Sequence, residues 1–273
     1  MNKKKIIFTD LDESLLNQNK YNAKILDKFI KGLIKENYSI VAITSKTFSE
    51  VTKLFKLNNI QFPFSTENGA LFTIPYSKSN KKLSFMNKVN NKAIKTSRIM
   101  DILSKLSSKY LKNISFIKDL NVDQQIKITN LKKEEIFYFN NRNFSVSIIW
   151  KGSNISLERF KKEISRYDLH ILFGGKVLNI SGCHTKLDAI KYFEKYYSKK
   201  LDISDFITVS IGDSNNDIEM LNYTDYSGVV KREDKKKIDL KFSNNIYFST
   251  KYAPEGWVEL VKLIKKKMEN SNS

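Results

Sequence analysis

Short apolar runs alternate with amphipathic stretches in the first part of the chain. Residues 6–12 and 38–45 are runs that predict buried strands, and residues 22–37 and 46–59 have apolar side chains at helical spacing. Residues 63–76 indicate a further strand or a hairpin. Strands that are apolar throughout and alternate with helices are typical of a parallel sheet that is covered on both faces.

The middle of the chain has a different pattern. Residues 95–111 are expected to be helical, and residues 132–143 to form the end of a helix. Short strands with glycine-rich turns are predicted at residues 144–150, 169–175 and 176–182. This mixture of helices and short strands predicts a separate antiparallel α+β unit from about residue 83 to residue 183.

The last part returns to the first pattern. A helix is expected at residues 185–197, a buried strand at 206–212, a loop and helix at 213–223, strands at 226–230 and 245–249, and a last helix at 256–268. We therefore expect an α/β fold, with a Rossmann-like parallel-sheet core and an inserted α+β cap domain. The expected division is 1–82 for the first part of the core, 83–183 for the cap and 184–273 for the second part of the core.

Composition changes this picture little. The chain of 273 residues has a formal net charge of +19 and a pI near 9.6, which would suit an acidic partner such as nucleic acid. The excess is nearly all lysine, however, and only five arginines are present, although arginine is the better residue for bidentate recognition of phosphates and bases. We expect instead that the positive field attracts a small anionic substrate.

The expected location is the cytoplasm, without a membrane. No apolar run approaches the length of a membrane span, and the apolar run near the start ends at Asp10, so we expect no signal peptide there. The single cysteine, Cys183, excludes a disulfide within the chain, as fits a reducing compartment. The oligomeric state does not follow from the sequence.

Polar side chains gather where the predicted strands end. Asp10, Asp12 and Ser14 end the first strand, Thr44 and Ser45 end the second, Asp213 and Asp217 follow a later one, and Lys186 begins the helix after the inserted unit. A single Asp or Ser after a strand often only caps a helix. In an open parallel sheet, however, the carboxyl ends of the strands are where ligands bind, so this combination predicts a catalytic site.

The aspartates of this set would repel one another if they were brought together. A hard divalent cation with oxygen ligands removes that repulsion, and Mg²⁺ shares its coordination with substrate phosphate. An aspartate can then attack phosphorus, because the cation and a lysine ammonium offset the charge of the phosphoryl group. Hydroxyl groups at a helix N-terminus suit phosphate binding.

These residues carry a resemblance to a known family. The segments "DLDESLL" and "ITS", the lysine at position 186 and the segment "GDSNND" resemble the four motifs of the haloacid dehalogenase superfamily of Mg²⁺-dependent aspartyl phosphatases. The position of the insert resembles the type IIB cap of that superfamily. Within it, the segments "TSKT", "ENGA", "RNFS", "GGK" and "APEGW" are similar to stretches of the mannosyl-3-phosphoglycerate phosphatase family.

The resemblance implies a role for each motif residue. Asp10 would be the nucleophile that becomes an aspartyl phosphate, and Asp12 the acid and base. Asp10, Asp12 (through its backbone carbonyl) and Asp213 would hold Mg²⁺. Asp217 would lie just outside these metal ligands or orient Lys186, and Asn216 would also lie just outside them. The phosphate would be bound by Thr44, Ser45 and Lys186.

The chain departs from the family pattern at a few positions. Glu13 stands where a glycine is usual after Asp12, Val146 and Ser147 stand where Glu and Pro are more common, and Thr185 stands where Asp is usual. These changes concern the cap and its junction more than the core. A substrate carboxylate beside the phosphate would be read by Lys46, Arg142 or Lys176, of which arginine offers the bidentate geometry.

The implied function is hydrolysis of a phosphorylated sugar derivative through an aspartyl-phosphate intermediate. The implied reaction converts mannosyl-3-phosphoglycerate to mannosylglycerate, a compatible solute. Alternatives are a phosphatase for glucosyl-3-phosphoglycerate or another sugar phosphate, or a phosphomutase of the same fold. A remote alternative is a basic nucleic-acid-binding protein with a degenerate core, which salt-sensitive DNA binding without phosphatase activity would favour.

Overall fold

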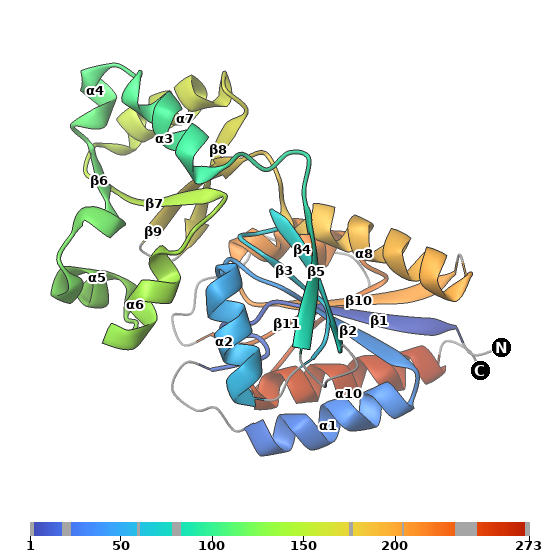
Figure 1. Cartoon of the computed structure of the whole chain (residues 1–273). Helices are drawn as coiled ribbons and strands as arrows, with labels where there is room; N and C mark the ends of the chain where they lie inside the picture. Colours follow the sequence, from blue (N-terminus) through green and yellow to red (C-terminus); the bar gives the residue numbers. More distant parts are fainter. Residues whose placement is uncertain are drawn as a thin grey trace.

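Two sheets organise the chain, as the computed structural model shows for residues 3–17, 23–58, 61–77, 83–174, 177–203, 205–232 and 245–270 (Figure 1). The larger sheet has the order β12 (Ile246–Phe248), β11 (Tyr226–Val229), β10 (Phe206–Gly212), β1 (Lys4–Thr9), β2 (Tyr38–Ile43), β3 (Phe64–Thr66), β4 (Leu71–Ser77) and β5 (Leu83–Val89). The strands from β12 to β3 are parallel to one another, whereas the pairs β3–β4 and β4–β5 are antiparallel. This confirms the expected α/β fold with a mainly parallel sheet.

Helices cover the larger sheet on both faces. They are α1 (Ala23–Lys35), α2 (Phe48–Asn58), α8 (Lys186–Leu201), α9 (Ile218–Tyr223) and α10 (Glu255–Asn270). Ile7 of β1 packs with residues of α1, α2 and α10, whereas its neighbours Ile6 and Phe8 pack with α8 and α9. Figure 1 shows α8 on one side of the sheet and α1 and α10 on the other. Successive side chains of a strand point to opposite faces, so a strand buried on both sides has to be apolar throughout.

The smaller sheet is antiparallel, with the order β6 (Ile114–Phe116), β7 (Ser145–Trp150), β9 (Val177–Gly182) and β8 (Leu169–Gly174). Its helices are α3 (Thr96–Ser104), α4 (Ser108–Leu111), α5 (Val122–Thr129), α6 (Lys133–Asn140) and α7 (Asn154–Ser165), with a 3₁₀ turn, η1 (Ile117–Asp119). The helices α3 and α7 pack on the sheet through a separate apolar cluster centred on Phe160. The chain therefore leaves the larger sheet after β5 and returns to it at α8.

Several local expectations were wrong. Residues 95–111 form two helices, α3 and α4, because the chain turns at Lys105: its N–H donates to the Ile102 carbonyl, and the next N–H, of Leu106, donates to the Leu103 carbonyl. Residues 132–143 contain a complete short helix, α6, and the elements β5, β6, α5 and α7 were not predicted. Since β5 pairs with β4 in the larger sheet, the segment from residue 83 begins on that sheet. The domain bounds 1–82, 83–183 and 184–273 stay a prediction.

None of the helices in the described part of the chain combines the length and the apolar character that a membrane crossing requires.

Trp257 joins the last helix to the first strand. Its side chain is fully buried, its ring meets Phe29 of α1 edge-on at 6.1 Å, and its indole N–H donates to Thr9 Oγ1 at 3.0 Å. Thr9 is the residue directly before Asp10, so α10 supports the strand end that carries the first motif.

We predict that Trp257→Ala destabilises the protein by about 3–5 kcal/mol, because the change leaves a large cavity and removes the hydrogen bond that the indole donates to Thr9 Oγ1. Urea unfolding measures the change. Leu57→Ala is the matched control, since Leu57 is 73% exposed and its loss should cost under about 0.5 kcal/mol. Equal costs for the two variants would contradict this account of α10.

Candidate active site

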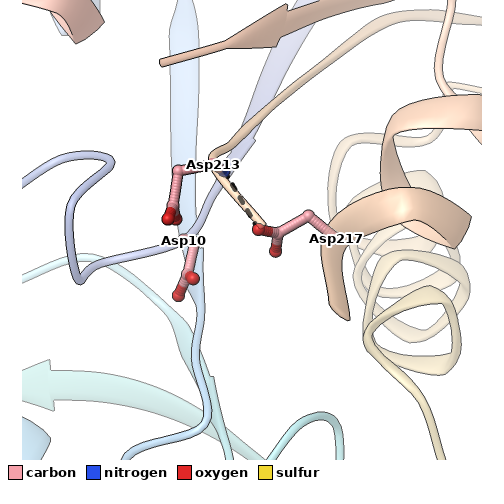
Figure 2. Close-up of side chains that lie close together, drawn as sticks. All are labelled: Asp10, Asp213 and Asp217. Carbon is pink, nitrogen blue, oxygen red and sulfur yellow. Dashed lines mark hydrogen bonds between the residues drawn. The ribbon is translucent and has the colours of Figure 1, made fainter. Parts of the chain in front are cut away.

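Three adjacent parallel strands bring the candidate residues to one edge of the larger sheet. Asp10 follows β1, Thr44 follows β2 and Asp213 follows β10, and β1 lies between the other two. Asp217 ends a 3₁₀ turn, η2 (Asn215–Asp217), just after β10. Figure 2 shows the carboxylates of Asp10, Asp213 and Asp217 grouped together. One oxygen from each lies within 4.8 Å of the others, and all three side chains are buried.

Lys186 lies between two of these carboxylates. Its ammonium is 3.0 Å from Asp10 Oδ2 and 2.7 Å from Asp217 Oδ1, and the residue is only 2% exposed. The lysine is the first residue of α8, where Thr185 caps the helix and Asp188 accepts the Thr185 N–H. Gly69 makes room for this helix start, because a Cβ at Gly69 would lie 2.1 Å from the Thr185 carbonyl oxygen.

Asp213 and Asp217 are held by further donors. Asp213 accepts from Ser14 Oγ at 2.9 Å through one oxygen and from Arg232 Nη1 at 2.5 Å through the other. Asp217 Oδ2 accepts from the N–H groups of Asp213 and Ser214, each at 3.0 Å. A cation that binds Asp213 therefore has to share it with Arg232.

The donors do not fully compensate the buried charge. Burial raises the pKa of Asp10 to about 7, Asp217 and Asp12 add to the rise, and Lys186 opposes it. Burial also raises the pKa of Asp213 well above its usual value, again with Asp217 and Asp10 adding to the rise. Burial alone would lower the pKa of Lys186, but the ion pairs with Asp10 and Asp217 outweigh it and raise that pKa. The site is thus short of positive charge.

This shortage of positive charge fits a divalent cation. The cluster offers only oxygen ligands, at a spacing that one ion can span, and such ligands are the ones that Mg²⁺ prefers. A cation here would offset both the cost of burying these carboxylates and the repulsion that adds to the raised pKa values of Asp10 and Asp213. The described residues can therefore hold a divalent metal ion.

Asp12 lies at the edge of the cluster and is more exposed. Its carboxylate pairs with Lys46 at 3.0 Å, and Lys46 also lies 3.8 Å from Glu50. Glu13 adopts a left-handed backbone with φ of 50°. That conformation explains why a glycine suits this position in the family pattern, and it costs a glutamate roughly 1 kcal/mol.

The expected phosphate ligands lie beside the cluster. Thr44 is fully buried and its Oγ1 accepts from the Lys46 N–H at 3.3 Å, whereas Ser45 lines a cavity of about 530 Å³. Asn216 lines the same cavity and accepts from Ser214 Oγ at 2.5 Å. The roles predicted for these residues stay predictions.

The inserted unit closes the other side of the cavity. It contributes residues of α5 and the turn after it, together with Phe139, Arg142, Val177 and Asn179. Arg142 lies over the Phe139 ring, with its guanidinium carbon 4.7 Å from the ring centroid. Two of the three expected carboxylate readers, Lys46 and Arg142, thus line the cavity, whereas Lys176 is outside the described residues.

Sequence reasoning missed several residues of the site. Arg232, Lys127 and Asn130 line the cavity, and Glu67 connects it to the inserted unit. Arg232 and Lys127 belong to none of the motifs, and lysine is so frequent in this chain that its presence at position 127 predicts nothing. Glu67 stands out in the sequence only as part of a family-like segment.

The comparisons with known proteins agree on one family. The sequence profile of the haloacid dehalogenase-like hydrolases matches residues 7–239. A "glucosyl-3-phosphoglycerate/mannosyl-3-phosphoglycerate phosphatase" from Persephonella marina is 27% identical over 236 residues, which are 85% of this chain and 86% of that protein. A protein of the same name from Methanococcoides burtonii is 24% identical over 259 residues, 93% of this chain and 94% of its own.

Solved structures have the same fold. A haloacid dehalogenase-like hydrolase from B. subtilis superposes with a TM-score of 0.57 at 17% identity, covering 95% of this chain and 98% of that one. One from Bacteroides thetaiotaomicron superposes with a TM-score of 0.59 at 13% identity, covering 97% and 99%. At these identities the likeness supports the fold alone.

The raised pKa of Asp10 leads to a prediction about stability. Because its pKa is near 7 in the folded protein and 3.8 for an ordinary aspartate, Asp10 favours the folded state below pH 3.8, and this contribution is lost as the pH rises through 7. Without metal, Asp10→Asn should therefore be about 1–3 kcal/mol more stable than the wild type at pH 8, and the two should be similar near pH 4. Urea unfolding in a chelator measures this; a variant less stable at pH 8 would contradict it.

Proposed function

Because the chain belongs to the haloacid dehalogenase-like hydrolases, we propose that it is a phosphatase for a phosphorylated sugar derivative. The substrate we propose is mannosyl-3-phosphoglycerate, which would yield mannosylglycerate. Glucosyl-3-phosphoglycerate is the second candidate, since the two relatives described above carry both substrates in their names.

One observation carries the proposal. The Lys186 ammonium, almost fully buried, touches Asp10 and Asp217 at the edge where Asp213 also lies. An ion pair that only stabilises the fold would need one carboxylate beside the lysine. A further buried carboxylate lowers the stability of the fold unless a bound group or a reaction uses its charge. A nucleophile beside a fixed positive charge is the arrangement that an attack on a phosphate anion requires.

The reaction would begin at Asp10. Its carboxylate oxygen forms a bond to phosphorus as the bond from phosphorus to the substrate alcohol breaks, and Asp12 gives that alcohol oxygen a proton. Asp12 then takes a proton from a water molecule, which attacks the aspartyl phosphate and releases inorganic phosphate. Asp12 suits this work because it is part-exposed at the cavity, whereas Asp10 is buried.

Other residues would hold the phosphoryl group in place. Lys186, Ser45 and Thr44 would bind its oxygens. Mg²⁺, when bound by Asp10, the Asp12 carbonyl and Asp213, would supply positive charge to the same oxygens. Asp217 would fix the lysine, and Asn216 would support the loop of Asp213 through Ser214.

The cavity supports a substrate with a second charged group. Among the described residues, four cationic side chains line it, namely Lys46, Lys127, Arg142 and Arg232. Lys46 pairs with Asp12 and Arg232 pairs with Asp213. The phosphate would be served by Lys186 and the metal, so Lys127 and Arg142 are the cations that we propose for a carboxylate such as that of glycerate. Ser147, where the family pattern has another residue, donates to Asn179 at 2.7 Å, and Asn179 lines the cavity. Ser147 and Asn179 are therefore our candidates for recognising the sugar.

The experiment that tests the function is phosphate release across a panel of phosphorylated compounds. The panel contains mannosyl- and glucosyl-3-phosphoglycerate, several sugar phosphates and an aryl phosphate. We expect the glycosylated phosphoglycerates to give the highest kcat/KM. Asp10→Asn, which keeps the shape and removes the attacking charge, should lose more than about nine-tenths of the activity. Transfer of the phosphoryl group to a bound sugar, without phosphate release, would favour a phosphomutase instead.

Removal of metal gives a second prediction. A chelator should abolish activity and Mg²⁺ should restore it, whereas Ca²⁺ should inhibit because it takes more ligands in a looser geometry. Thermal unfolding gives a readout without substrate: Mg²⁺ should raise the Tm of the wild type more than that of Asp10→Asn, which lacks the negative charge of one ligand. Full activity in excess chelator would refute metal dependence.

A further inference from the structure

Glu67 lies where the loop after β3 meets the candidate phosphate site. The residue is 2% exposed, and it begins a run of three residues with positive φ, followed by Asn68 and Gly69. The Glu67 N–H donates to the Lys46 carbonyl, and the Asn68 N–H donates to the Thr44 carbonyl, each at 2.9 Å. The loop is therefore bonded to the segment that would bind phosphate.

The Glu67 carboxylate holds the inserted unit. It accepts from the N–H groups of Asn143 and Phe144 at 2.9 Å and 3.0 Å, and from Ser145 Oγ at 2.5 Å. These three residues lead into β7 and are more than seventy positions away in sequence, as their separations of 76, 77 and 78 show. Hydrogen bonds to a buried carboxylate are about twice as strong as neutral ones, so this is a firm connection between the two units.

A hydrogen-bond relay extends from Glu67 to Arg142. The Ser145 hydroxyl donates its only proton to Glu67, which leaves its oxygen free to accept from Arg142 Nη1 at 3.0 Å. Arg142 Nη1 also approaches the Ser45 carbonyl oxygen at 3.4 Å. The guanidinium is thus held between the two units at the wall of the cavity, with the Phe139 ring beneath it.

We propose that Glu67 is a positioning residue that sets the place of Arg142 through Ser145, so that Arg142 binds a second anionic group of a phosphorylated ligand. The proposal rests on the proposed function, because it takes a carboxylate beside a phosphate as the ligand. An alanine at position 145 breaks the relay but leaves both backbone N–H bonds to Glu67. A glutamine at position 67 keeps the shape but replaces one accepting oxygen by a donor.

The test is calorimetric titration of the Mg²⁺-loaded protein with 3-phosphoglycerate and with inorganic phosphate. We expect the wild type to bind 3-phosphoglycerate at least about tenfold more tightly than phosphate, the scale of one charge-assisted pair. Arg142→Ala, Glu67→Gln and Ser145→Ala should each remove most of that preference, and phosphate affinity should change less than about twofold. The double variant Glu67→Gln/Arg142→Ala should lose no more than Arg142→Ala.

Thr47→Val is the matched control. Thr47 Oγ1 donates to the Tyr138 carbonyl at 2.8 Å, so it also joins the two units, but no bond from it leads to Arg142. This variant should keep the preference for 3-phosphoglycerate. If it loses the preference as Glu67→Gln does, any loosening of the two units is enough and the relay is wrong.

Other outcomes would also overturn the proposal. Equal weakening of both ligands in Glu67→Gln and Ser145→Ala, or losses that add to that of Arg142→Ala, would mean that Glu67 only supports the fold. A wild type without preference for 3-phosphoglycerate would refute it as well. Because binding is measured, a protein that releases no phosphate from any ester yet shows the expected preference would refute the proposed function and leave this inference standing.

Discussion

The burial of three carboxylates around one ammonium is the constraint on which the rest of the site depends. At an effective dielectric constant of about 20, each like-charged pair at about 4 Å costs roughly 4 kcal/mol. Asp10, Asp213 and Asp217 are all buried, and Lys186 contacts only two of them. Serine, arginine and backbone donors offset part of the repulsion. Burial, together with the neighbouring carboxylates, still raises the pKa values of Asp10 and Asp213. Such a site favours further positive charge, and a divalent cation would supply it.

The same edge of the sheet also determines how the inserted unit meets the core. The segment after β2 has its carbonyl groups bonded to the loop of Glu67, and Glu67 in turn binds the segment before β7. Residues that would bind phosphate and residues that would read the remainder of the ligand therefore share one hydrogen-bonded frame. A mutation in this frame should alter discrimination between ligands more than the chemistry itself.

The core of the site could be predicted from sequence because parallel strands place their carboxyl ends at one edge. Asp10, Thr44 and Asp213 each follow a buried strand, and these three strands are neighbours in the sheet. Glu67 could not be found in this way, since its partners lie at distances along the chain that no local pattern encodes. Arg232 lies shortly after the end of β11 at the same edge, but it belongs to no motif that marks it as a partner of Asp213.

Local signals were weaker in the inserted unit. The break between α3 and α4 falls within a continuous helical pattern, and β6 is a strand of only three residues. The strand β5 has mixed burial and pairs only at the sheet edge, so its sequence lacks the apolar run that marks the other strands. Short or exposed elements are selected by their tertiary partners more than by their own sequence.

The central claim is that Asp10 attacks phosphorus, and trapping of the intermediate tests it most directly. An aspartyl phosphate is reduced by borohydride to homoserine, so a reaction quenched during turnover and then reduced should carry homoserine at position 10. Peptide mass spectrometry locates it, and a sample without substrate should retain aspartate there. Homoserine at another aspartate, or intact aspartate at position 10 under conditions where phosphate is released, would contradict the account.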